Sequence, residues 1–130
     1  PAFVMQGETP LMAFGVMGGY LQPQAHALIV MNIIDFGMNV QEAGDAARGV
    51  HSADSHPTGG RMQDGGTIYL ESDIPQSVVQ GLKSLGHSVV HGERQYVGSF
   101  GGYQAIWRDP KTGVYHGASE MRYDGAATGY

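Results

Sequence analysis

The chain opens with two short apolar runs separated by a polar tetrapeptide. The runs are Ala2 to Met5 and Pro10 to Val16, and Gln6-Gly7-Glu8-Thr9 lies between them. Apolar runs of this length are typical of strands, and a glycine among polar residues suits the turn of a hairpin. The pattern therefore predicts a β-hairpin at the start of the chain.

A pair of glycines separates this hairpin from the longest apolar stretch. Gly18-Gly19 follows the second run, and Pro23 then stands where the first turn of a helix tolerates a missing N–H. The residues up to Phe36 are apolar on nearly every helical face, so we expect a helix that is buried between layers and ends at Gly37. A strand, a glycine loop and a helix are thus predicted in succession.

Polar residues mark a second helix and a long loop. Asn39 is a good N-cap and Glu42 completes the spacing of a capping box, which predicts a short helix through Ala47. From Arg48 to Gly66 the chain is rich in His, Ser, Asp, Pro and Gly without periodicity. We expect a long surface or interface loop there.

The second half of the chain alternates between short apolar runs and turn residues. Asp73-Ile74-Pro75 opens a helix whose apolar residues continue at helical spacing to Leu85, and Gly86 caps it. A turn at 109–113 joins the last two strands, and we expect the tail after them to close the sheet. The predicted strands are Thr67 to Leu70, His87 to Val90, Gln104 to Arg108 and Val114 to Ala118.

Composition narrows the class of protein. The 130 residues are 42% hydrophobic and 15% charged, which is typical of a globular chain and predicts one domain over residues 1–130 without a clear second core. Seven scattered Lys and Arg and a formal net charge of −5 argue against a nucleic-acid binder. The absence of cysteine excludes disulfides, thiolate nucleophiles and cysteine-ligated zinc, and it leaves the redox compartment open. The apolar stretch from Ala25 to Met38 is too short to cross a bilayer.

Gly18-Gly19 is the strongest candidate for a functional site. Paired glycines let backbone N–H groups approach a ligand at a helix N-terminus, where the helix dipole favours negative charge. The same pattern also suits an ordinary tight turn, and the residues alone leave both interpretations open. No Lys-Ser/Thr follows the pair, so it is not a phosphate loop.

Other reactive side chains form weaker patterns. His51, Asp54 and His56 lie in one loop, but they lack helical His spacing and a clear fourth ligand, so we favour a solvated loop over a metal site. No serine lies in a Gly-x-Ser-x-Gly elbow, which argues against a classical triad. We expect neither a metal nor a cofactor. The serines considered as nucleophiles are Ser52, Ser55 and Ser99.

Three polar side chains have mainly structural interpretations. His26 lies on the apolar helix and is expected to be a hydrogen-bonded core histidine rather than a base. Arg48 and Arg122 have small or apolar neighbours, so we expect both to be partly buried. Each then needs a carboxylate or carbonyl partner and pins segments of the chain together.

Three aromatic residues suggest either a binding wall or simple packing. Tyr103 and Trp107 fall in a predicted strand, where aromatic rings usually pack against a neighbouring layer. Tyr20 directly follows the glycine pair. We favour packing over a wall formed by all three.

Short motifs are spread from the first to the last residue. They are Pro1-Ala2-Phe3-Val4, Phe14-Gly15-Val16-Met17-Gly18-Gly19, Gln22-Pro23-Gln24, Asp35-Phe36-Gly37-Met38-Asn39, Glu42-Ala43, Asp45-Ala46-Ala47-Arg48, Phe100-Gly101-Gly102-Tyr103-Gln104-Ala105-Ile106, Gly117-Ala118-Ser119, Arg122, Asp124-Gly125 and Gly129-Tyr130. Together they resemble the gamma-glutamyltranspeptidase family of N-terminal-nucleophile hydrolases, in the C-terminal part of its small subunit. Val16-Met17 is similar to the gamma-glutamyltranspeptidase-like branch rather than to the Ser-Pro form of the best-known enzymes.

The resemblance implies a fold and a reaction. The fold is α+β, an αββα four-layer sandwich of the N-terminal-nucleophile hydrolase type, of which this chain forms one part. The reaction begins in a self-cleaving precursor that frees a threonine, whose hydroxyl attacks a gamma-glutamyl amide while its α-amino group accepts the proton. The acyl group then passes to water or to an amine. In this family a Gly-Gly pair donates backbone N–H groups to the oxyanion, and Gly18 and Gly19 match that pair.

The same resemblance places the threonine, and the residues that bind the glutamyl α-carboxylate and α-amine, upstream of Pro1. With an opening strand already under way, we expect a fragment or a processed chain that is inactive and unstable alone. Its expected partners are the large subunit and the N-terminal part of the small subunit of its own precursor, and a small gamma-glutamyl substrate such as glutathione. A related acylase acting on glutaryl or cephalosporin-type side chains, and a non-catalytic family member, are the alternatives.

Overall fold

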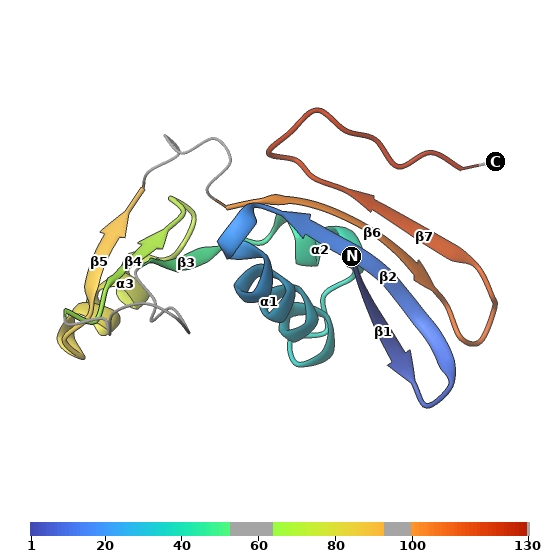
Figure 1. Cartoon of the computed structure of the whole chain (residues 1–130), viewed down its shortest axis with the longest axis horizontal. Coiled ribbons are helices and arrows are strands. Elements are labelled where there is room, and N and C mark those ends of the chain that lie inside the picture. Colours follow the sequence, from blue (N-terminus) through green and yellow to red (C-terminus); the bar gives the residue numbers. More distant parts are fainter. Residues whose placement is uncertain (53–63, 93–99, 130) are drawn as a thin grey trace. The chain divides into compact units, whose positions relative to one another are not determined.

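The computed structural model describes residues 1–52, 64–92 and 100–129. The chain divides into two compact units, one made of 1–46 with 98–130 and the other of 47–97. We call them the terminal unit and the middle unit; each has its own sheet (Figure 1). Leu70 and Val79 are buried in the middle unit, which therefore has a small core of its own. The sequence had led us to expect a single core.

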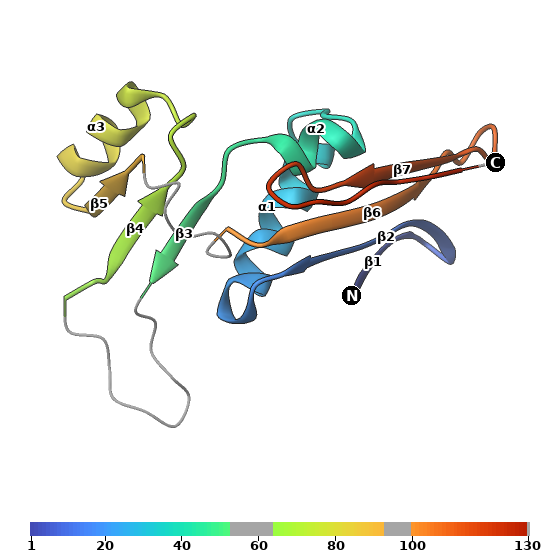
Figure 2. The ribbon, with the colours of Figure 1, turned by 90° about the horizontal axis from the view of Figure 1, so that it is seen from above.

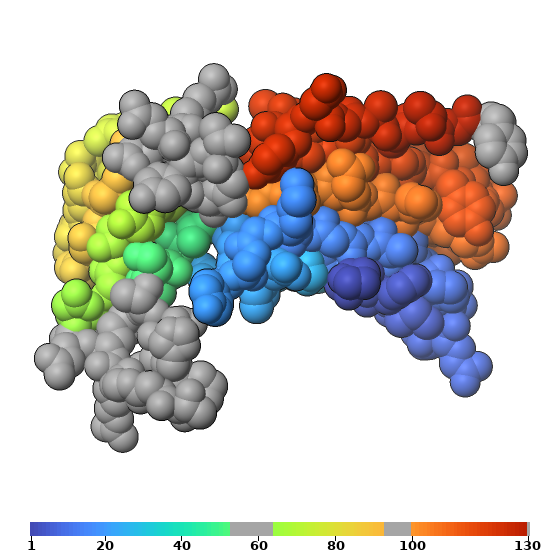
Figure 3. All heavy atoms as spheres, turned by 45° about the horizontal axis from the view of Figure 1, so that its top comes forward, coloured from blue at the N-terminus to red at the C-terminus, as the bar shows by residue number. Residues whose placement is uncertain are grey.

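A four-stranded antiparallel sheet forms the terminal unit. Its order is β1-β2-β6-β7, and Figure 3 shows the colours of these strands next to one another. The predicted β1–β2 hairpin is confirmed, and Gly7 has a φ of 60° in its turn. In the predicted turn between β6 and β7, the Asp109 carboxylate accepts hydrogen bonds from the N–H groups of Lys111 and Thr112. The strands are β1 (Ala2–Gln6), β2 (Thr9–Met17), β6 (Gly102–Arg108) and β7 (Tyr115–Ser119).

One face of this sheet is covered by two helices. Helix α1 (Gln22–Ile34) packs on β2, and α2 (Val40–Asp45) packs on β6 and β7 (Figure 2). The rings of Phe14 on β2 and His26 on α1 lie 5.1 Å apart. The core therefore lies between the helices and this face. Its buried apolar residues include Met12, Phe14, Val16, Leu21, Ala25, Ile29, Val40, Ala43, Tyr103, Ala105 and Ala118.

Helix α1 is not buried on all sides, which differs from the expectation. Ala25 and Ile29 are buried, whereas Met31 and Ile34 are exposed, as is Phe36 beyond the helix end. The described chain supplies a packing layer for one side of the helix only. The apolar surface on the other side is exposed to water within the described residues, which costs free energy.

The cap of α2 confirms the sequence pattern. The side chain of Asn39 accepts hydrogen bonds from the N–H groups of Gln41 and Glu42, and the Glu42 carboxylate accepts one from the N–H of Asn39. These bonds form a capping box. The helix ends at Asp45, slightly earlier than expected.

The middle unit has a three-stranded sheet in the order β3-β4-β5. Strand β3 (Gly49–Ser52) is antiparallel to β4 (Thr67–Leu70), and β5 (Ser88–His91) is parallel to β4. Helix α3 (Gln76–Ser84) connects β4 to β5 and packs on β5. Gly86, at φ 91°, ends the helix as predicted: its N–H and that of the next residue donate to the carbonyls of Lys83 and Leu82, in a Schellman motif.

Two predictions about irregular segments were wrong. The stretch from Arg48 to Gly66 is not a loop throughout, because residues 49–52 form β3; four residues are too few to show a strand alternation in the sequence. The rest of that stretch up to residue 63 lies outside the described residues. The tail, over its described residues 120–129, forms no strand, so β7 is the edge of the sheet. The α+β class is confirmed.

Candidate active-site loop

Gly18 and Gly19 form the turn that leads from β2 into α1. Their φ angles are 151° and 62°, in a region that L side chains rarely adopt. The N–H of Leu21 donates to the carbonyl of Gly18 at 3.3 Å, and a short 3-10 turn, η1 (Gly19–Leu21), continues into α1. The predicted succession of strand, glycine loop and helix is therefore confirmed.

The two glycines differ in the space around them. A Cβ added at Gly18 would lie 3.1 Å from Leu21 Cδ2 and 3.3 Å from Gly101 Cα, whereas one added at Gly19 would meet nothing within 4 Å. None of the turn, loop and cap backbone bonds among the described residues has the N–H of Gly18 or Gly19 as its donor. These groups lie just before a 13-residue helix whose dipole favours an anion at this end. The loop thus combines a left-handed backbone with open space at Gly19.

A second glycine pair, Gly101-Gly102, lies against the strand end that precedes the loop. Gly102 pairs with Met17 at the end of the β2–β6 ladder. Gly101 has a φ of 75°, and a Cβ there would lie 2.5 Å from both the carbonyl oxygen of Met17 and Cγ1 of Val16. Real Cβ atoms do not approach backbone oxygen so closely, so only glycine fits this position without a shift of the chain.

His26 contacts the same strand end from helix α1. The N–H of Val16 donates to Nε2 of His26 at 3.1 Å. Burial lowers the pKa of His26 from 6.5. An imidazole whose Nε2 accepts a hydrogen bond is neutral and carries its proton on Nδ1. The expectation of a hydrogen-bonded histidine is confirmed, although the residue is half-buried rather than fully in the core.

A buried ion pair lies next to the second glycine pair. Oε2 of Glu120, a residue only 3% exposed, accepts the N–H of Tyr103 at 2.8 Å. Its Oε1 accepts bonds from the N–H and Nη1 of Arg122, at 3.0 and 2.8 Å. Arg122 also donates to the carbonyls of Gly44 and Ala46. The pair therefore ties the end of α2 to β6, which confirms the predicted role of Arg122.

Sequence reasoning did not assign a role to Glu120, and it used Gly101 only within a motif. The usable signal for Glu120 is the Glu-Met-Arg spacing directly after the last predicted strand. Two opposite charges at that position suggest an ion pair at the end of a sheet. No local pattern marks Gly101 as crowded, because the atoms that crowd it belong to Val16 and Met17, far away in the sequence.

The weaker candidates have ordinary structural partners where the structure describes them. His51 Nε2 hydrogen-bonds to the carbonyl of Gly65 at 2.8 Å, and the hydroxyl of Ser52 donates to the carbonyl of Thr67 at 3.3 Å. Within residues 1–52, 64–92 and 100–129, no group of three or more His, Cys, Asp or Glu is arranged to hold a metal ion. No described helix is long and apolar enough to cross a membrane. Four other candidates, Asp54, Ser55, His56 and Ser99, lie outside the described residues.

Arg48 is almost completely buried, as expected, at 2% exposure. Its N–H donates to a carboxylate oxygen of Glu71 at 2.7 Å, and its carbonyl accepts the N–H of Glu71 at 3.1 Å. These bonds join the residue before β3 to the residue after β4, within the middle unit.

The aromatic residues pack as the strand pattern predicts. Tyr103 is fully buried, and its ring lies so close to Gly44 that a Cβ there would overlap it. Trp107 follows on the same face of β6, four pairs further along the ladder. Tyr20 is 88% exposed in η1. A single wall of all three rings is therefore not formed.

Comparison with known proteins identifies relatives along the whole chain. Residues 1–130 match the family model described as Gamma-glutamyltranspeptidase. The glutathione hydrolase-like YwrD proenzyme of Bacillus subtilis is 31% identical over 99% of this chain, and the oxamate amidohydrolase proenzyme of Klebsiella pneumoniae is 31% identical over all of it. The chain spans 23% of the length of each of these two relatives.

A solved structure shares the fold. The cephalosporin acylase of Bacillus halodurans superimposes with a TM-score of 0.78 and 37% identity, over 98% of this chain and 22% of that one. The match extends over both units of the chain, so the strands and helices described above are those of a known fold.

Proposed function

Since the chain belongs to the gamma-glutamyltranspeptidase family, we propose that it is the C-terminal portion, residues 1–130, of the catalytic domain of an N-terminal-threonine amide hydrolase or acyltransferase. Gly18 and Gly19 supply the oxyanion-binding part of its active site. The observation that carries this proposal is the loop itself: two glycines at positive φ, directly before helix α1, with open space at Gly19.

The proposed reaction uses these N–H groups at one point. The hydroxyl of a threonine outside this chain attacks the amide carbon, a C–O bond forms, and the carbonyl oxygen becomes an anion. Hydrogen bonds from the backbone N–H groups of Gly18 and Gly19 stabilise that anion. The C–N bond then breaks, and the amine leaves with the proton that the threonine α-amino group took up. Water or an acceptor amine finally removes the acyl group.

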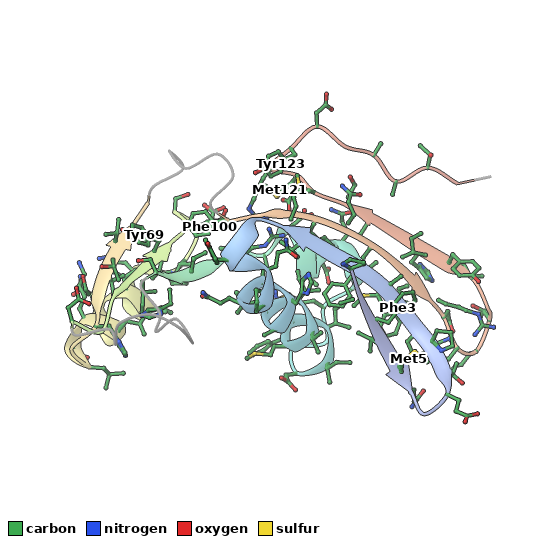
Figure 4. The ribbon with its side chains drawn as sticks, in the orientation of Figure 1. Phe3, Met5, Tyr69, Phe100, Met121 and Tyr123 are labelled. Atoms are coloured by element: carbon green, nitrogen blue, oxygen red, sulfur yellow. The ribbon has the colours of Figure 1, made fainter. Side chains whose placement is uncertain are left out.

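The proposed partner of the chain is the remainder of its own precursor. Two observations support this. The curated relatives are named proenzymes and are about four times longer than the matched region. In addition, the sheet face opposite the helices is apolar and exposed: Phe3 and Ile106 both lie on it, since each shares a register row with Ala13. Phe3 and Met5 project from β1 in Figure 4. Another layer of the same protein is the natural cover for such a face.

The proposed substrate is a gamma-glutamyl amide of the glutathione type, which the glutathione hydrolase-like relative suggests. The second candidate is a glutaryl or cephalosporin-type amide, because the acylase structure shares 37% identity with the chain. Both substrates use the same attack and the same oxyanion loop. They differ in the groups that bind the acyl side chain, which we place upstream of Pro1.

The test is an assay of the full-length precursor that contains residues 1–130. We expect it to cleave itself and then to release the chromophore from a gamma-glutamyl anilide. Activity on a glutaryl amide with no release from the gamma-glutamyl anilide would replace the first substrate by the second. A protein without Thr, Ser or Cys at the processing position, and without activity on either amide, would contradict the enzymatic function.

A further inference from the structure

His26 lies on the helix that follows the proposed oxyanion loop and contacts the strand that precedes it. Its Nε2 accepts the N–H of Val16 at 3.1 Å, ten residues back in the chain. Val16 is a buried residue of β2 and lies opposite Tyr103 on β6. A buried N–H without an acceptor is costly, so this bond stabilises the last part of β2.

The position of this bond relates it to the glycine pair. Val16 is two residues before Gly18, and His26 lies in the second turn of α1, after Gly19 and η1. The loop is therefore closed by a bond between the elements on its two sides. On its other flank, Val16 and the Met17 carbonyl lie so close to Gly101 that a Cβ there would clash with both.

From these contacts we propose that His26 is a positioning residue that sets the orientation of the Gly18 and Gly19 N–H groups by holding Val16. This rests on the proposed function. The residue acts through the backbone and does not transfer protons, because the Nε2 lone pair that a base needs is occupied by the Val16 N–H. A neutral ring is required for this role, and burial favours the neutral form by lowering the pKa of His26.

Three variants of the full-length precursor test the proposal. His26→Gln keeps an acceptor at about the distance of Nε2, His26→Asn carries the same amide on a shorter chain that does not reach Val16, and His26→Leu has no acceptor. His87→Gln is the matched control, because this exposed histidine lies in the middle unit. The kcat and KM of each are measured with the best amide substrate, per mole of processed active sites, together with the melting temperature.

We expect kcat to fall roughly 10- to 100-fold in His26→Asn and His26→Leu, because a small displacement of catalytic groups has effects of this order. KM should change little, since the loop acts on the transition state rather than on substrate binding. His26→Gln should recover most of the loss, and His87→Gln should match the wild type.

Two results would overturn the inference while leaving the proposed function intact: a wild-type kcat in His26→Leu, or equal losses in His26→Gln and His26→Asn. If His26→Leu does not fold or process, the Gln and Asn pair decides alone. A wild-type precursor that cleaves none of the amides would instead remove the proposed function, and the inference with it.

Discussion

The two glycine pairs of the terminal unit lie close together but differ in what a side chain would meet. At Gly101 a Cβ would lie 2.5 Å from a backbone oxygen, and at Gly102 it would lie 2.5 Å from Cε of Met17. At Gly19 it would meet nothing within 4 Å. Gly101 is crowded by a backbone oxygen, Gly102 is crowded by side-chain atoms, and Gly19 has an unfavourable φ for other residues with open space beside it.

Glycine is therefore present at these positions for two different physical reasons. Crowding at Gly101 makes that glycine a support for the end of β2, and openness at Gly19 leaves room for a ligand. Gly18 is crowded as well, since its Cβ would lie 3.1 Å from Leu21, and its φ of 151° also favours glycine. Substitutions at the two pairs should therefore affect different quantities, stability at Gly101 and catalysis at Gly19.

The largest expected effect is the loss of stability in Gly101→Ala. A left-handed φ costs an alanine roughly 1–2 kcal/mol, and overpacking against Val16 and Met17 adds about 1–3 kcal/mol. We expect the apparent free energy of unfolding of the precursor to fall by about 2–5 kcal/mol, measured by denaturant titration.

Gly113→Ala is the matched control for this prediction. Gly113 has nearly the same φ, 76°, but the nearest atom to its Cβ would be Nη2 of Arg108, 3.8 Å away. Only the conformational cost of roughly 1–2 kcal/mol applies there. Equal losses for the two variants would show that crowding at Gly101 has no effect and would remove the contrast between the pairs.

The sequence predicted the helices, strands and turns around the two glycine pairs better than it predicted the contacts between distant segments. The hairpin, the loop before Pro23 and the Asn39 cap all follow from turn, cap and periodicity rules that act within a few residues. The crowding at Gly101 depends on atoms more than 80 residues away in the sequence, so no local pattern contains it.

The same limit explains the errors in the fold. Strand β3 has four residues and owes its existence to pairing with β4 across the segment 53–66, which the sequence does not display. The burial of α1 was overestimated from its apolar residues. Apolar residues on several faces of a helix show that these faces tend to be buried, but not whether this chain contains the elements that cover them. The role of Gly18 and Gly19 came from family resemblance and stays a proposal.

A substitution at Gly19, the glycine with open space beside it, tests the proposed catalytic role of the loop. In Gly19→Ala no clash arises, so stability should fall only by the roughly 1–2 kcal/mol of the unfavourable φ. The N–H remains but shifts as the backbone relaxes, and we expect kcat to fall roughly tenfold with little change in KM. Gly18→Ala should lose more stability, because its Cβ meets Leu21 and Gly101. A wild-type kcat in Gly19→Ala, measured per active site, would count against the oxyanion role.

The smallest expected effect is a pH dependence of the stability that His26 contributes through its hydrogen bond to Val16. The contacts at Gly101 involve no titrating group and should not depend on pH. Burial lowers the pKa of His26 from 6.5, so the unfolded chain binds the proton more readily than the folded one. The contribution of His26 to stability is then complete above pH 6.5 and is lost as the pH falls through 6.5 toward the lower folded pKa. His26→Gln has no such titration. Unfolding of both proteins between about pH 8 and pH 5 should show a stability difference that shrinks on acidification, whereas a difference constant with pH would mean that His26 does not need to be neutral to hold Val16.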